Sequence, residues 1–286
     1  MKSNKIKKFQ QISNLSRIYT LISIYFAGSG HPGGSLSVVD IINFIFIKYL
    51  KIKNLKDFKI INRNRFILSK GHAVPAFYSL LAAKKILKFK DIFSLRNINS
   101  IFQGHPDTMY TPFVEASTGS LGQGFSYAVG QAIAYKKLKI NKNIFVVIGD
   151  GEMQEGQIWE GLMLSKNLKL DNLVIILDYN KIQSDDFVKN ISSIEPLQDK
   201  IKSFGCNLIN INGHSFEELD YAFNKKYKNK NPKFIIANTI KGKGVSFMEN
   251  VPSWHGSVKM SLDQIINSLV ELKAEKKLIK LCEKKL

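Results

Sequence analysis

The chain has 286 residues, of which 44% are hydrophobic and 23% charged, a balance typical of a globular protein that excludes global disorder. Lysine and arginine total 42 against 23 acidic residues, a formal net charge of +19, but only four of the basic residues are arginine. Because specific readers of nucleic acid favour arginine, we interpret the excess of lysine mainly as compositional bias, with some attraction to anionic substrates.

Cellular context follows from three further features. No run of about 18–20 apolar residues predicts a membrane span, and the basic N-terminus lacks the apolar core of a secretion signal. The two cysteines, Cys206 and Cys282, are too few for a disulfide framework. We therefore expect a cytoplasmic protein without a membrane partner.

Hydrophobic spacing and turn residues divide the chain into alternating elements. We predict helices at about 5–27, 36–50, 121–138, 153–168, 216–227 and, amphipathic and Lys-rich, about 261–286, and a loop that leads into a helix within 71–85. We predict strands within 65–70, 144–150, 172–180, 206–213 and 233–244. Such alternation predicts an α/β fold: a doubly wound, mostly parallel sheet with helices on both faces. We find no convincing boundary and predict one domain over residues 1–286.

Two polar motifs follow neighbouring apolar strands. GDGE at 149–152 and DYN at 178–180 are separated by one predicted helix, the spacing of a βαβ unit. If the strands are neighbours, Asp150 and Asn180 project into one crevice at the carboxyl ends of the sheet. Carboxylate and amide oxygens suit Mg²⁺ or Ca²⁺, and Gly149 and Gly151 allow a phosphate to approach the backbone. An ordinary strand-to-helix turn capped by Asp150 is the alternative.

All five histidines lie beside a glycine, in predicted loops. This placement favours a site for an anionic, polyhydroxylated substrate, because imidazole can donate hydrogen bonds and move protons near neutral pH. The candidates are His31, His72, His105 and His255. His214 opens a predicted helix remote from the other motifs, and we interpret it as structural. The segment TGSLGQG at 118–124 is a weaker signal for exposed backbone that contacts a ligand.

The ordered motifs GSGHPGG, LSKGH, GHPD, TGSLGQG, GDGEMQEG, DYNKIQ and KGKGVSFMENVPSWHG resemble the amino-terminal part of transketolase, a thiamine diphosphate enzyme. The resemblance covers residues of about 10–258 and implies the diphosphate-binding domain of the thiamine-diphosphate-binding fold. It implies thiamine diphosphate as cofactor, anchored by Mg²⁺, Ca²⁺ or Mn²⁺. It also implies ketol transfer between sugar phosphates in the pentose phosphate pathway.

The same resemblance implies a role for individual residues. Asp150, Asn180 and the backbone carbonyl of Ile182 would hold the metal. The residues that would contact the cofactor are His72, Gly119, Ser120, Leu121, Gly151, Asn180 and His255. The residues implied in catalysis are His31, His105 and His255, near the donor sugar, and Glu155, which would link two active sites across a dimer.

Transketolases of full length continue with a pyrimidine-binding domain, for which we find no counterpart after Lys259. The resemblance therefore implies the split form, in which a separate C-terminal subunit completes the enzyme, by analogy as an α2β2 assembly. Two alternatives stay open: another thiamine diphosphate enzyme, such as one similar to 1-deoxyxylulose-5-phosphate synthase, and, from a different class, a basic nucleic-acid-binding protein. The latter predicts clustered arginines and stacking aromatics, which the sequence does not clearly show.

Overall fold

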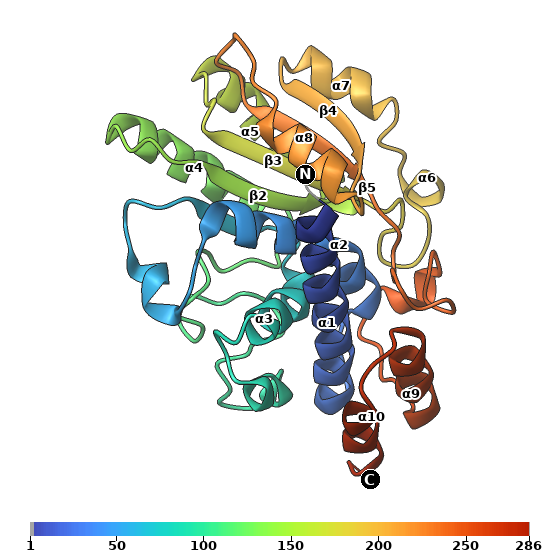
Figure 1. Cartoon of the computed structure of the whole chain (residues 1–286). Coiled ribbons are helices and arrows are strands. Elements are labelled where there is room, and N and C mark those ends of the chain that lie inside the picture. Colours follow the sequence, from blue (N-terminus) through green and yellow to red (C-terminus); the bar gives the residue numbers. More distant parts are fainter. Residues whose placement is uncertain (1–2, 286) are drawn as a thin grey trace.

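Five parallel strands form the sheet at the centre of the fold, in the order β1-β2-β3-β5-β4 (Figure 1). The computed structural model describes residues 3–285. The strands are β1 (Arg65–Leu68), β2 (Ile144–Gly149), β3 (Leu173–Tyr179), β4 (Asn207–Asn212) and β5 (Lys233–Asn238). Each lies within a segment for which the sequence predicts a strand, so the prediction of a parallel sheet is confirmed.

Helices cover both faces of this sheet. They are α1 (Ser3–Ala27), α2 (Pro32–Ile45), α3 (Val74–Ala83), α4 (Gln123–Lys137), α5 (Gly156–Asn167), α6 (Val188–Ile191), α7 (Leu197–Ser203), α8 (Phe216–Asn224), α9 (Leu262–Glu271) and α10 (Lys276–Glu283). A π-helical turn at Phe46–Leu50 continues α2. The short helices α6 and α7 were not predicted from the sequence.

Alternate residues of the strands face opposite cores, as the two-residue period of a strand requires. Val147 and Ile176 pack into the larger core, to which α1, α2, α3 and α8 contribute. Val146 and Ile175 pack into the second core, formed with α4, α5 and α7. In the strand order, the chain moves one way along the sheet from β2 to β3 and the other way from β4 to β5. Because both connections are right-handed crossovers, their helices, α5 and α8, lie on opposite faces of the sheet. The predicted doubly wound architecture is confirmed.

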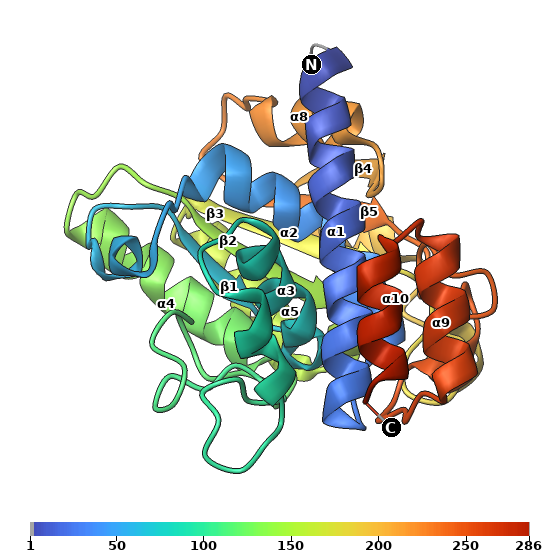
Figure 2. The ribbon, with the colours of Figure 1, turned by 60° about the horizontal axis from the view of Figure 1, so that its bottom comes forward.

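The C-terminal segment differs from the single surface helix expected at about 261–286, of which residue 286 lies outside the described part of the chain. It forms two helices, α9 and α10, which lie beside α1 (Figure 2). Lys273 adopts a left-handed φ of 54°, which ends α9. Leu269 and Leu278 are buried, and the Asn14 side chain donates a hydrogen bond of 2.8 Å to the Leu272 carbonyl. The bend lets both apolar faces pack against the domain.

One helical stretch, Pro32–Leu50, is long and apolar enough to cross a membrane by length and composition. Of an apolar section of 18 residues within this stretch, 83% is buried against the rest of the chain. A core helix of a folded domain has the same properties, and Asp40 and Asn43 lie within it.

The register of the sheet determines which loops meet. Gly149 at the end of β2 pairs with Asp178 near the end of β3, so the residues that follow these strands lie at the same edge. The segments after β1 and β5 reach this edge as well, because all strands point the same way. In open parallel sheets this edge is where ligands bind.

Truncation of a side chain at the centre of the sheet should destabilise the whole fold. Ile176 on β3 is fully buried, and the exchange Ile176→Ala removes apolar contacts and leaves a cavity. We expect the free energy of unfolding in urea to fall by about 2–5 kcal/mol. Ile98 is 93% exposed, so Ile98→Ala should change it by less than about 0.5 kcal/mol. Equal effects of the two substitutions would contradict the strand assignment.

Candidate functional site

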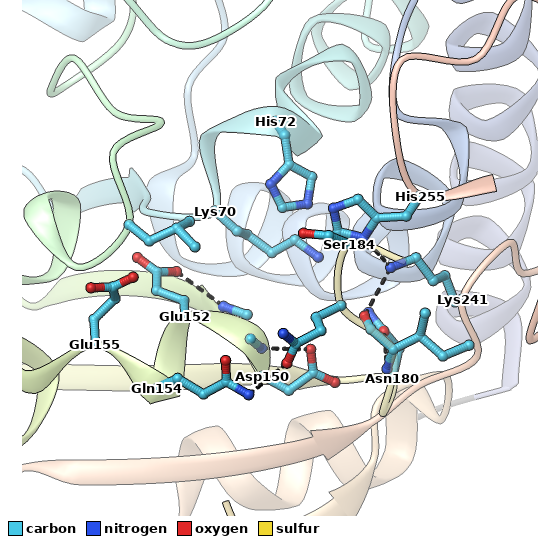
Figure 3. Close-up of a pocket in the computed structure, with 15 residues that line it drawn as sticks. Lys70, His72, Asp150, Glu152, Gln154, Glu155, Asn180, Ser184, Lys241 and His255 are labelled. Atoms are coloured by element: carbon cyan, nitrogen blue, oxygen red, sulfur yellow. Dashed lines mark hydrogen bonds between the residues drawn. The ribbon is translucent and has the colours of Figure 1, made fainter. Parts of the chain in front are cut away.

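A cavity of about 150 Å³ opens at the carboxyl edge of the sheet. Figure 3 shows Asp150 and Asn180 on one side of it, His72 and His255 on the other with Lys241 beside His255, and Glu152 and Glu155 at one end. Leu121, Gly151 and Ile182 also line it. Eight of the sequence-predicted site residues therefore border one cavity: His72, Leu121, Asp150, Gly151, Glu155, Asn180, Ile182 and His255.

Asp150 and Asn180 meet as the sequence predicts. One Asp150 carboxylate oxygen accepts a hydrogen bond of 2.9 Å from the Gly151 amide, and the other accepts one of 2.5 Å from the Lys181 amide, directly after Asn180. The Asn180 side-chain oxygen accepts a hydrogen bond of 3.2 Å from the Ile182 amide. Burial raises the pKa of Asp150 to about 6, although the positive charges of Lys241 and Lys70 oppose that rise.

This donor set suits a hard divalent cation. Within residues 3–285, no group of three or more His, Cys, Asp or Glu side chains could hold a metal ion. Where Asp150 and Asn180 meet, the cavity offers the Asp150 carboxylate, the Asn180 amide oxygen and the Ile182 carbonyl, which is the mixed oxygen chemistry that Mg²⁺ and Ca²⁺ accept. The Ile182 carbonyl accepts a hydrogen bond of 2.8 Å from the Lys241 ammonium, so a metal bound to this oxygen would replace that contact. The residues present therefore fit a metal that anchors a diphosphate.

Two buried lysines, for which the sequence analysis named no role, border the cavity. Lys70 is 2.5 Å from an Asp178 carboxylate oxygen, and neither side chain is accessible to more than 2%. Ser37 donates to the same oxygen at 2.6 Å, and Thr239 donates to the other at 2.5 Å. Burial alone raises the pKa of Asp178, but Lys70 and these hydrogen bonds outweigh it and hold that pKa below its ordinary value.

The second lysine, Lys241, also contacts the ring of His255 through its ammonium group. Burial, together with the charge of Lys70, lowers the pKa of Lys241 to about 7, against the opposing attraction of Asp150 and Asp178. The Lys70 ammonium, together with that of Lys241 when it is protonated, forms a favourable environment for an anionic ligand. A signal was present in the sequence, because each lysine precedes a glycine just after a strand, in SKGH and IKGKG.

Four histidines form a cluster centred on His31. Its ring centroid lies 5.2 Å from that of His72, 6.2 Å from that of His105 and 5.9 Å from that of His255. The rings of His72 and His255 are 5.1 Å apart. The prediction that these glycine-flanked loops converge is therefore confirmed, although their roles stay predictions.

The surroundings of the cluster disfavour the charged form of each ring. Burial, the charge of Arg96 and the neighbouring His105 lower the pKa of His31 to about 4, and burial and Lys241 lower that of His255 to about 3. Burial also lowers the pKa of His72 and of His105. A neutral imidazole has one donor and one acceptor nitrogen. The Nδ1 atoms of His31 and His255 already face Arg96 and Lys241, so their Nε2 atoms are the ones left to contact a bound hydroxyl group.

Two glycines allow close contact with this cluster. A Cβ atom on Gly34, in the first turn of α2, would lie 2.9 Å from the His72 ring nitrogen. A Cβ atom on Gly119 would lie 2.8 Å from the His105 ring, and its φ of 138° disfavours other residues. Ser120 and His105 border a more open cavity of about 510 Å³ next to the cluster. The TGSLGQG loop thus lies between the two cavities.

The two acidic residues of the GDGEMQEG segment differ. The Glu152 carboxylate is buried and accepts hydrogen bonds from the Ser69 hydroxyl, the Gly122 amide (2.9 Å) and the Gly149 amide (3.1 Å). It thereby ties the TGSLGQG loop to the end of β2, a role that the sequence did not reveal. Glu155 is exposed at the rim of the cavity, at the start of α5.

Comparison with known proteins gives a consistent result. Residues 8–270 match the family "Transketolase, thiamine diphosphate binding domain". The chain is 38% identical to the 6-deoxy-6-sulfo-D-fructose transketolase subunit of a Clostridium species, over 93% of this chain and 96% of that one. It is 35% identical to human transketolase, over 96% of this chain and 44% of that one. The crystal structure of Campylobacter jejuni transketolase matches with a TM-score of 0.87 and 29% identity, over 98% of this chain and 47% of that chain.

Removal of the charge on Asp178 should be severely destabilising. Asp178→Asn leaves the buried Lys70 ammonium without its counter-charge, which costs about 3–5 kcal/mol in the free energy of unfolding. The double variant Lys70→Met with Asp178→Leu removes both charges and should lose clearly less. Urea denaturation measures both. As a control, Asp199→Asn removes an exposed carboxylate and should cost less than about 1 kcal/mol. A loss that small for Asp178→Asn would refute the argument.

Stability should fall as the pH is lowered from about 6.5 to 4, measured by thermal unfolding without metal. In this range the unfolded chain binds protons at His31 and His255, whose pKa values in the folded chain are about 4 and about 3, so protonation favours unfolding. Asp150, with its pKa raised to about 6, opposes this trend. The variant His31→Asn should therefore show a flatter pH dependence than the unaltered chain, and an unchanged slope would contradict the lowered pKa.

Proposed function

The chain belongs to the transketolase family, and we propose that it is the N-terminal, cofactor-binding subunit of a two-chain transketolase. In this proposal the assembled enzyme transfers a two-carbon ketol unit, glycolaldehyde, from a ketose phosphate to an aldose phosphate, as in the pentose phosphate pathway. The cytoplasmic location expected from cysteine usage belongs to the same proposal.

The observation that carries the proposal is the convergence of charges and oxygen ligands at one edge of the sheet. Asp150, Asn180 and the Ile182 carbonyl supply the oxygen ligands for a divalent metal, most simply Mg²⁺. Lys70 and Lys241 add positive charge beside the same cavity. A diphosphate needs both features, whereas a neutral ligand would gain nothing from the two lysines.

The remaining residues around the cavities suit the rest of the cofactor. His72, Gly151 and His255 border the cavity where the diphosphate would bind. Gly119, Ser120 and Leu121 lie between the two cavities, where they would contact the aminopyrimidine and thiazolium rings. When bound, thiamine diphosphate supplies the nucleophilic carbon and the electron sink that ketol transfer requires.

The histidine cluster would act on the sugar. His31, His105 and His255 come from three separate loops and lie close together, so they can orient the hydroxyl groups of the donor and exchange protons with them.

We propose that the sugar substrate carries an anionic group. Two relatives are named for different substrates: the Clostridium subunit for 6-deoxy-6-sulfo-D-fructose, and a Phocaeicola vulgatus subunit for apulose 4-phosphate, at 37% identity over 88% of each chain. Both names describe an anionic sugar. A reaction similar to that of 1-deoxyxylulose-5-phosphate synthase would instead consume pyruvate, and product analysis with pyruvate or with a ketose phosphate separates the two.

A partner chain is supported by the relatives and by the surface. The Clostridium and Phocaeicola relatives are named as transketolase subunits, and this chain covers 96% and 88% of their lengths. Apolar side chains of α4 and α5, namely Tyr127, Met163 and Leu164, are about half exposed. Both helices begin next to the cavity, after Leu121 and after Glu155. We propose that a pyrimidine-binding C-terminal subunit completes the site, in an α2β2 assembly that Glu155 helps to link.

The direct test is reconstitution. The purified chain, alone and mixed with a C-terminal transketolase subunit, is assayed for two-carbon transfer from xylulose 5-phosphate to ribose 5-phosphate with thiamine diphosphate and Mg²⁺. We expect activity only in the mixture, and a loss of about a hundredfold or more for Asp150→Ala, because even residues beyond the metal ligands cost 10–100-fold. The exposed Asp199→Asn is the matched control. Turnover by the chain alone, or unaffected turnover in Asp150→Ala, would refute the proposal.

A further inference from the structure

The fifth histidine, His214, lies outside the cluster but is not isolated. It follows β4 and immediately precedes Ser215, the residue that caps α8. Its ring is largely buried, with 13% of the side chain exposed. The Nδ1 atom is 2.7 Å from an Asp40 carboxylate oxygen on α2, and the Ile240 amide donates a hydrogen bond of 2.9 Å to Nε2.

These two partners determine the protonation of the ring. A backbone amide can only donate, so Nε2 must carry a free lone pair. A carboxylate accepts, so the single ring proton of this neutral imidazole lies on Nδ1. His214 therefore links a carboxylate of α2 to the backbone after β5, and each nitrogen has a separate partner.

Asp40 is itself held rigidly. Arg17 of α1 donates two hydrogen bonds to its carboxylate oxygens, at 3.2 Å and 2.6 Å. Burial alone would raise the pKa of Asp40, but Arg17 and His214 hold that pKa well below its ordinary value. The ring of His214 is thus oriented by an ion pair between two core helices.

The residue after Ile240 is Lys241, whose ammonium borders the candidate cofactor cavity. The short segment around it is attached at several points, and the Lys241 carbonyl itself accepts a hydrogen bond of 2.9 Å from the Asn250 amide. The Thr239 hydroxyl donates to Asp178, the Ile240 amide to His214, and the Gly242 amide to the Gly33 carbonyl, at 3.0 Å. The hydrogen bond of the Ile240 amide directly precedes the lysine in sequence, and it is the one made to a histidine side chain.

We propose that His214 is a positioning residue: through its hydrogen bond to the Ile240 amide, it holds Lys241 at the cavity where the diphosphate binds. The inference rests on the proposed function for the nature of the ligand. The connection from Arg17 through Asp40 and His214 to Ile240 rests on the contacts alone. The NGHS segment thereby has a role at the site, although it is far in sequence from the other motifs.

Two substitutions separate the two bonds of the ring. His214→Gln can place a carbonyl oxygen near the position of Nε2 and keep the acceptor for Ile240. His214→Asn can reach only the position of Nδ1 and keeps the bond to Asp40. If His214 acts on Lys241 through Ile240, glutamine should preserve the function and asparagine should not. If the histidine is only a packing element, both variants should behave alike.

The probe is inorganic pyrophosphate with Mg²⁺, titrated calorimetrically into the whole chain. We expect the Kd to rise about tenfold in His214→Asn and to stay within about twofold in His214→Gln, the effect of one lost buried hydrogen bond. The crystal structures of both variants provide a second measurement, the distance between the Lys241 ammonium and the Ile182 carbonyl, which is 2.8 Å here. It should be kept in the glutamine variant and lost in the asparagine variant.

The outcomes separate the two proposals. The role of His214 would be overturned if both variants bound pyrophosphate as tightly as the unaltered chain does. It would also be overturned if both variants bound it equally more weakly. Either result would leave the proposed function intact. An unaltered chain that binds no pyrophosphate would count against the proposed function. In that case the crystallographic distance still decides whether His214 positions Lys241.

Discussion

The buried ion pair between Lys70 and Asp178 is the contact on which the architecture of the site depends. Asp178 lies near the end of β3, yet its partners come from the segment after β1, from α2 and from the segment after β5. A charge without solvent must keep its partners at fixed distances, because each lost contact leaves an uncompensated group in a medium of low polarity. Four segments distant in sequence are thereby held in one arrangement around the cavity.

In this site, lysines carry the positive charge and histidines provide hydrogen-bonding groups. Lys70 and Lys241 provide positive charge next to the cavity, and this charge helps to keep His72 and His255 neutral. A neutral imidazole keeps one acceptor nitrogen, which in His31 and His255 is the Nδ1 atom that faces Arg96 and Lys241. If the histidines carried the charge instead, they would lose their acceptor nitrogens. The arrangement suits a ligand with an anionic part and a part rich in hydroxyl groups, as proposed for the cofactor and the sugar together.

Most of the fold was predictable because the signals were local. The runs that form β2 and β3 are rich in branched apolar residues and end in turn motifs. The candidate histidines could be recognised because each has a glycine beside it in the sequence. The helices α6 and α7 are short and polar, and the left-handed turn at Lys273 depends on packing against α1, so neither has a clear local signal. Lys70 and Lys241 were overlooked because lysine is abundant along the whole chain. The contacts of His214 depend on the strand order, which periodicity does not specify.

The glycines at positions 34 and 119 have a consequence for how this site can vary. His72 and His105 each rest against a backbone that has no side chain, at a spacing too short for even one methyl group. The inner shape of the pocket therefore depends on the lack of side chains at these two glycines as much as on the functional groups around it. A methyl group at either position would displace an imidazole while leaving every chemically active group in the sequence. A related chain with all the histidines and lysines, but with alanine at these two positions, would therefore have the same reactive groups in a differently shaped pocket.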